Sequence, residues 1–330
     1  MYSLVANHFY LLTSNLKNYL MKKPFIDFYN KYNIIPTSQN VKDVKSFLYQ
    51  RNHLYSNLGI PLSFFSNKNI IEFGPGGGWN AQATSFFRPR SYTFVDGSEK
   101  SIYELRKKIK NKKINAKKIK LIKRDIFNFK AKKKYDIGIV EGTIPNQIYP
   151  NKMLKIISKC VKNGGVLITT THSPFSLLSE VCRRLLRIKL YNSSIGFENR
   201  LKTSCKIFKS HLATLKTTTR PVKDWVSDVI LHDHSFKNKY DFDTLDTLKC
   251  LEKNFYFYNS HPKFLIDDTW HKHIKNQNHT NKLYKKQHIL NSLFLIDYRL
   301  EFKNFRLKKN TLKNIKKIEK LSKKIILIHN

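Results

Sequence analysis

The residues best suited to chemistry form a glycine-rich loop directly after an apolar run. The run at 70–73 leads into Gly74-Pro75-Gly76-Gly77-Gly78, and a helical pattern begins at Trp79. A strand, a glycine turn and a helix in succession bring backbone N–H groups to the carboxyl edge of a sheet, where open α/β sheets bind nucleotides. Trp79 replaces the third glycine of the dinucleotide fingerprint and no Gly-Lys-Ser/Thr follows. Nicotinamide cofactors and nucleoside triphosphates are therefore disfavoured.

Acidic residues close three successive strand-like runs around this loop. Glu72 precedes the glycines, where it could receive a cationic ammonium but would repel a pyrophosphate. Asp96, about 20 residues further on, can accept both hydroxyl protons of a ribose. Asp125 can accept an adenine amino hydrogen while Ile126 covers the ring. The pattern favours a site for adenosine with an amino-acid tail, although each aspartate could instead be a helix cap.

The elements expected to position these residues alternate between strands and helices, the rhythm of a parallel sheet with helices on both faces. The sequence therefore predicts an α/β fold with a doubly wound, mostly parallel sheet. Its strands are expected at Ile70–Phe73, Tyr92–Val95, Ile119–Lys123, Tyr135–Val140 and Gly165–Thr171. Its helices are expected at Trp79–Phe87, Glu99–Lys112 and Lys152–Val161, the last closed by a left-handed glycine in Asn163-Gly164-Gly165.

The segments around this sheet predict additions to the core. An N-terminal helical segment that covers the sheet is expected at residues 1–66, with its clearest helix at Val41–Asn57. The cofactor-binding core is expected at 67–190 and ends in a helix at Phe175–Leu190. An insertion at 191–253 is expected to form an acceptor lid. Residues 254–270 are expected to add a final hairpin, Phe255–Ser260 with Phe264–Ile266, to the sheet. Residues 271–330 are expected to form a helical tail.

Residues 68–172 resemble the class I S-adenosylmethionine (SAM)-dependent methyltransferase family through the segments IIEFGPGGGWN, SYTFVDGS, LIKRDIFNF, YDIGIVEG and VKNGGVLITT. The flanking FYNKYNIIPTSQN, HLATLKTTTRPVKDW and PKFLIDDTW look like those of bacterial members. The resemblance implies that the glycines wrap the methionine portion of SAM, and that Glu72 serves its amino group, Asp96 its ribose and Asp125 its adenine. It places Glu141 and Gly142 beside the transfer site. The implied cofactor-binding set is Glu72, Gly74, Pro75, Gly76, Gly78, Asp96, Gly97, Asp125, Ile126, Glu141 and Gly142.

Methyl transfer from a sulfonium is an in-line displacement, so a general base is optional. His172, just after the fifth strand, is the best placed candidate base, followed by Glu141. His172 could instead cap the helix near Pro174, and Glu141 could hold backbone or cofactor. Aromatic residues expected to line an acceptor pocket, unless they belong to the core, are Tyr55, Trp225 and Trp270.

The sequence leaves several classes of methyl acceptor open. The chain has 62 Lys+Arg against 23 Asp+Glu, a net charge of +39, which either attracts nucleic acid or membranes or reflects an AT-rich gene. The nucleobase-methylation signature is missing at Glu141–Asn146, so a small-molecule or carbohydrate acceptor is preferred. An RNA or ribosome acceptor is the alternative, favoured by the basic run Arg106–Lys134. A third possibility is a non-catalytic protein at an anionic membrane surface, suggested by the tail stripe Leu312, Ile315, Ile318, Leu321 and Ile325.

Metal binding, disulfides and membrane insertion are not expected. The triplets His232-Asp233-His234 and His271-Lys272-His273 lack an identifiable third ligand. The cysteines Cys160, Cys182, Cys205 and Cys250 show no paired short spacing. The N-terminus lacks the basic start and cleavage site of a signal peptide, and no run of about 18 apolar residues could span a bilayer. We therefore expect a soluble, cytoplasmic protein.

Overall fold

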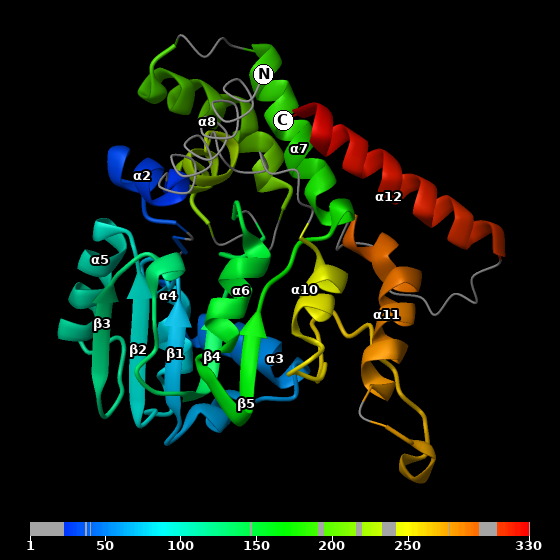
Figure 1. Cartoon of the computed structure of the whole chain (residues 1–330). Helices are drawn as coiled ribbons and strands as arrows, with labels where there is room; N and C mark the ends of the chain where they lie inside the picture. Colours follow the sequence, from blue (N-terminus) through cyan, green and yellow to red (C-terminus); the bar gives the residue numbers. More distant parts are fainter. Residues whose placement is uncertain are drawn as a thin grey trace, which may run out of the picture.

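The computed structural model describes residues 23–36, 38–39, 41–145, 147–190, 195–215, 220–232, 242–276, 278–296 and 309–329. Its centre is a five-stranded, all-parallel sheet in the order β3-β2-β1-β4-β5 (Figure 1). The strand order reverses between β1 and β4, which confirms the doubly wound fold. The strands are β1 (Asn69–Phe73), β2 (Ser91–Asp96), β3 (Ile119–Lys123), β4 (Tyr135–Val140) and β5 (Val161–Thr169).

Helices cover both faces of the sheet because side chains alternate between the faces along each strand. Ile70 packs with the first layer, whereas the next residue, Ile71, packs with the second. The first layer contains α3 (Val44–Asn57), η1 (Leu62–Phe65), α4 (Trp79–Thr84) and α5 (Glu99–Lys110). The second contains η2 (Ile126–Asn128), α6 (Pro150–Ser158) and α10 (Thr244–Leu251). The carboxyl edge of the sheet is thus the edge left for a ligand.

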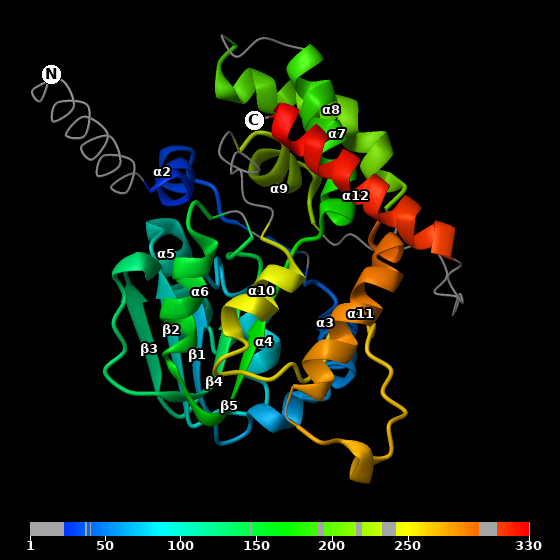
Figure 2. The ribbon, with the colours of Figure 1, turned by 45° about the vertical axis from the view of Figure 1, so that its right-hand side comes forward.

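A group of helices, here called the helical cover, lies beyond the carboxyl ends of the strands in both views (Figures 1 and 2). It has its own apolar core, in which Phe208 and Trp225 pack with Leu201, Val226 and Ile230. The helical cover comprises α2 (Pro24–Lys31), α7 (Pro174–Leu190), α8 (Phe197–Ala213), α9 (Val222–Trp225) and η3 (Val226–Ile230).

The C-terminal part lies to one side of the sheet and cover. It contains η4 (His271–His273), α11 (His279–Asn291), η5 (Ser292–Leu295) and α12 (Lys309–His329). Helix α12 lies beside α7 in Figure 1 and overlaps it in Figure 2, and the two helices pack together. The long helix α12 is therefore docked on the helical cover rather than on the sheet.

Two boundary predictions need correction. Residues 255–260 and 264–266 form no strand. Side chains of α11, rather than another strand, bond the backbone of this extended segment. Asn281 accepts from the Phe257 N–H at 2.7 Å, and the Gln287 side chain bonds both the N–H and the carbonyl of Ile266. Strand β5 begins at Val161, earlier than predicted. Gly164, with φ of 71°, accordingly lies in the irregular start of β5 and does not cap a helix.

Candidate active site

The glycine loop joins β1 to α4 in a conformation that other residues rarely adopt. Gly74, Gly76 and Gly78 have φ of 63°, 56° and 73°, all left-handed. A Cβ on Gly78 would lie 2.5 Å from Leu105, and one on Gly74 would collide with Thr143. The loop therefore needs glycine both for its dihedral angles and for its close packing against Leu105 and Thr143.

Glu72 is buried beside this loop, with only 3% of its surface exposed. Tyr92, on the neighbouring strand β2, donates its hydroxyl hydrogen to Glu72 Oε2 at 2.5 Å and also lies 2.7 Å from Thr84 Oγ1. Burial raises the pKa of Glu72 to about 8, despite the opposing effect of the Tyr92 hydrogen bond. Near neutral pH the group therefore holds a proton that a nearby cation would displace.

Asp96 ends β2 and ties the glycine loop to the next turn. Its carboxylate accepts from the backbone N–H groups of Gly76, at 3.2 Å, and Ser98, at 2.8 Å. Burial raises the pKa of Asp96 to about 6, although these N–H groups favour the charged form. A carboxylate has about four acceptor sites, so these two bonds leave capacity for hydroxyl donors.

Asp125 and Ile126 follow β3 in a more structural arrangement. Asp125 accepts from the Phe127 N–H at 3.0 Å and so caps η2. Ile126 is buried in the second core layer with Phe129 and Phe73. The capping interpretation of Asp125 thus describes part of its role, and its half-buried carboxyl lies near the same sheet edge as Asp96.

Glu141, directly after β4, is the centre of a hydrogen-bond network that sequence reasoning missed. Arg51 donates to both of its oxygens, at 2.7 and 3.0 Å, Tyr55 donates at 2.6 Å, and Asn80 at 2.6 Å. Burial alone would raise the pKa of Glu141, but the Arg51 guanidinium and the other donors hold it below its ordinary value. Arg51 and Tyr55 are four residues apart on α3, a spacing that places both on one helix face and was the available signal.

His172 lies three residues beyond the end of β5, and Glu141 one residue beyond β4, at the shared carboxyl edge. Burial lowers the pKa of His172 to about 4, so its imidazole is neutral at physiological pH. Its Nδ1 is buried without a hydrogen-bond partner among the described residues. Ser173, whose Oγ accepts from the Phe175 N–H, takes the capping role at the start of α7. His172 therefore has no capping bond to explain its position.

The three aromatic residues expected to line one pocket are not brought together. Tyr55 is fully buried in the core and stacks edge-on with Phe65. Trp225 is buried inside the helical cover, and Trp270 is 59% exposed. Tyr55 and Trp225 pack in two separate apolar clusters, and the Tyr55 hydroxyl also donates to Glu141.

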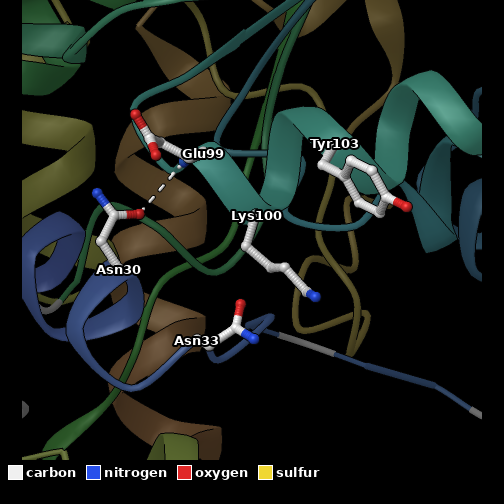
Figure 3. Close-up of a pocket in the computed structure, with 5 residues that line it drawn as sticks. All are labelled: Asn30, Asn33, Glu99, Lys100 and Tyr103. Carbon is white, nitrogen blue, oxygen red and sulfur yellow. Dashed lines mark hydrogen bonds between the residues drawn. The ribbon is translucent and has the colours of Figure 1, made fainter.

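Helix α2 and the turn after it lie against the cofactor loop. A Cβ on Gly97 would collide with Ile26, and one on Gly77 would lie 3.0 Å from Ile35. Asn30 accepts from the Glu99 N–H at 3.2 Å. Between α2 and α5 lies a hollow of about 310 Å³ lined by Asn30, Asn33, Glu99, Lys100 and Tyr103 (Figure 3). The loop at the end of β2 is thus covered by α2 and bordered by a polar hollow.

The two histidine triplets have separate environments. His232 is fully buried against Phe28, with ring centroids 4.0 Å apart, whereas Asp233 and His234 lie outside the described residues. His271 and His273 are exposed on η4. Within the described ranges there is no cluster of three potential metal ligands. The same ranges contain no helix long and apolar enough to cross a membrane.

Part of this chain is similar to known methyltransferases. Residues 65–219 match a family model described as a methyltransferase domain, and no curated protein matches the chain. A solved structure of the N-methyltransferase NodS from Bradyrhizobium japonicum WM9, in complex with S-adenosylhomocysteine, aligns at 16% identity over 39% of this chain and 63% of NodS, with a TM-score of 0.31. PKMT2 from Rickettsia typhi aligns at 16% identity over 75% of this chain and 50% of its own, with a TM-score of 0.46.

A SAM-dependent methyltransferase from Clostridium acetobutylicum ATCC 824 aligns at 19% identity over 54% of this chain and 61% of its own, with a TM-score of 0.31. This chain thus spans less than two thirds of each of these three structures. The match to a methyltransferase domain covers residues 65–219, a segment that contains all five strands of the parallel sheet.

Proposed function

We propose that this protein transfers a methyl group from SAM to a small-molecule or carbohydrate acceptor, at oxygen or nitrogen, by in-line displacement. The observation that carries the proposal is the carboxyl edge itself. Three left-handed glycines lie there between buried Glu72 and Asp96, and a Cβ on Gly74 or Gly78 would collide with Thr143 or Leu105. Bound there, SAM would supply an electrophilic methyl group on a sulfonium.

The residues present fit this cofactor. Asp96 has unused acceptor capacity for the ribose hydroxyls, and Asp125 would lie at the adenine end. Glu72, whose pKa is about 8 without a ligand, would ionise beside the methionine ammonium. The backbone of Gly74, Pro75, Gly76 and Gly78, with Gly97 and Gly142, would surround the remainder. Ile126 is buried in the core, so any contact with the adenine would involve only an edge of its side chain.

The Glu141 network would hold the methyl end of the site in place. The two oxygens of Glu141 already accept four hydrogen bonds, which argues against Glu141 as the base. Its role would be to fix Arg51, Tyr55 and Asn80 in one arrangement. Arg51, whose Nε is buried without a hydrogen-bond partner among the described residues, would then be available to a carboxylate in the site.

His172 is the residue we propose as general base for a hydroxyl acceptor. Its buried Nδ1 has no hydrogen-bond partner among the described residues and would be open to the hydroxyl of an acceptor. Replacement by Asn should lower kcat by about 100-fold or more while SAM affinity stays unchanged. An unchanged kcat with the physiological acceptor would remove His172 from the mechanism.

The position of the charges supports a small acceptor over RNA. The lysines of 112–118 and 132–134 lead into the amino ends of β3 and β4, opposite the edge that holds Asp96 and Glu141. The carboxyl edge is instead overlaid by the helical cover (Figure 1), with α2 against Gly97 and the turn after α2 against Gly77. A basic track to the methyl site would be expected for an RNA substrate.

The test begins with calorimetry of SAM binding, where no binding at millimolar cofactor would remove the enzyme proposal. Radiolabelled SAM is then incubated with a cell metabolite extract and, separately, with an RNA extract. Label transferred to a metabolite fraction supports the proposal. Label transferred only to RNA would replace it with the RNA alternative, and SAM binding without transfer to any fraction would favour a non-catalytic protein.

A further inference from the structure

The C-terminal helix α12 uses only part of its apolar surface for docking. Ile315 and Ser322, one heptad apart, are 1% and 2% exposed, and α12 packs along α7. If the apolar residues of α12 served only to dock the helix on α7, all of them would be buried against α7. The next residues along the stripe show that they are not.

Ile318 and Leu321 remain 36% and 49% exposed, and Ile325 is half-buried. At about 100° per residue, these three positions form a strip directly beside the docked face and running along the helix. The strip therefore follows helical periodicity, as an interaction face does, and is separate from the contact that Ile315 makes.

Lysines border this strip on its outer side. Lys313, Lys317, Lys320 and Lys324 project from the face opposite the docked residues, and all four are exposed. The only acidic residue of α12 is Glu319, which pairs with Lys323 at 3.0 Å. The helix thus combines an exposed apolar strip with a strongly positive edge.

The partner helix extends the apolar character of this region. Near the end of α7, Leu186 and Leu190, four residues apart on one face of the helix, are each close to half exposed. Helices α7 and α12 cross on the outside of the molecule, away from the strands (Figures 1 and 2). A flat partner could approach the helix pair without meeting the sheet.

We propose that the α12 strip, Ile318 and Leu321 with the lysines beside them, docks peripherally on an anionic phospholipid surface. Lysines near such a surface attract acidic headgroups while their aliphatic stems reach past the apolar boundary. The aliphatic side chains would enter the headgroup region, as in other interfacial amphipathic helices. RNA would engage the lysines but offers no apolar layer to Ile318 and Leu321, so the strip favours a bilayer.

The experiment uses the full-length protein and flotation with phosphatidylcholine vesicles, with or without about 30% phosphatidylglycerol. The wild type should bind the anionic vesicles and scarcely bind the neutral ones. The triple variant K317Q/K320Q/K324Q should bind roughly 100-fold more weakly, at about fivefold per lysine. The variant I318Q/L321Q should lose about tenfold or more.

Two control variants distinguish binding through the α12 strip from the effects of overall charge and of exposed apolar residues elsewhere. K110Q/K113Q/K118Q removes the same charge at the opposite edge of the sheet, and I266Q/I274Q removes two isoleucines that are 44% and 42% exposed outside the helix pair. Both should retain vesicle binding. Circular dichroism and SAM binding of every variant report whether the fold is intact, and neither requires an acceptor.

Equal losses in the lysine control would show a general charge effect and overturn the proposal. The same follows if wild-type protein ignores anionic vesicles, or if I318Q/L321Q binds them as well as wild type. Single-stranded RNA is the competing probe: if the α12 lysine variant loses RNA binding but keeps vesicle binding, the surface is a nucleic-acid site instead.

Discussion

The carboxyl edge of the sheet and the helical cover both bury ionisable side chains, but the hydrogen bonds to these side chains differ. At the sheet edge, Glu72 is buried with Tyr92 as its hydrogen-bond donor among the described residues, and its pKa is raised to about 8. In the cover, Arg184 donates to the backbone carbonyls of Val229 and His232, at 3.0 and 2.9 Å, where a helix ends. The cover's charge completes its own fold, whereas the charge at the sheet edge leaves room for a ligand.

The largest effect is expected from Arg51→Met, which removes the cation from the Glu141 network. Glu141 would be left buried with an uncompensated charge, at a cost of about 3–5 kcal/mol in the free energy of unfolding. Urea denaturation measures this change. Arg51→Lys should lose less, and Glu141→Gln combined with Arg51→Met should recover part of the loss. A loss below about 1 kcal/mol would contradict the buried-pair interpretation.

The next largest effect should follow from Asp96→Ala. If Asp96 accepts two ribose hydroxyl hydrogens, its removal should weaken SAM binding by roughly 100-fold, since hydrogen bonds to charged groups contribute about 1.5–3 kcal/mol each. Calorimetry measures the affinity. Asp136→Asn alters a carboxylate at the amino end of β4, which bonds Asn69, and should leave SAM affinity unchanged. Equal affinities for wild type and Asp96→Ala would refute the ribose role.

A smaller effect on SAM affinity is expected from the protonation of Glu72. A cationic ligand favours the ionised form, so SAM affinity should rise by up to about tenfold per pH unit between pH 6 and 8 and level off above the pKa of about 8. Glu72→Gln should bind more weakly and without this slope. Proton release measured by calorimetry in buffers of different ionisation enthalpy checks the same step.

The same group predicts the pH dependence of folding without ligand. The folded pKa of Glu72, about 8, lies above its ordinary value of 4.5, so the folded state binds the proton more tightly than the unfolded state. The stability that Glu72 contributes should therefore be complete below about pH 4.5 and be lost as the pH rises through 8. Glu72→Gln should remove this dependence, and an unchanged profile would contradict the raised pKa.

Local chain order explains why one region could be predicted better than the other. The sheet order and the positions of Glu72, Asp96 and Glu141 follow from strands, turns and helices that are adjacent in sequence. The bonds of Arg51 and Asn80 to Glu141 join residues 90 and 61 positions apart, so no local pattern specifies them. The prediction of a hairpin at 255–266 was wrong because its sequence pattern is typical of strands. The side chains of Asn281 and Gln287 form the hydrogen bonds with this backbone that a neighbouring strand would otherwise form.

The smallest effect tests whether the two regions act separately. Tyr29, on α2, donates its hydroxyl hydrogen to Asp228 of η3 at 2.9 Å, and Arg220 pairs with the same carboxylate. Tyr29→Phe should cost about 1.5 kcal/mol of unfolding free energy, because a buried carboxylate loses one of its donors. Thermal and urea denaturation measure this loss, and amide exchange should quicken in α2. SAM affinity should change little, since Asp96 keeps its bonds to Gly76 and Ser98. A loss of affinity as large as that of Asp96→Ala would instead show that the helical cover and the cofactor edge form one cooperative site.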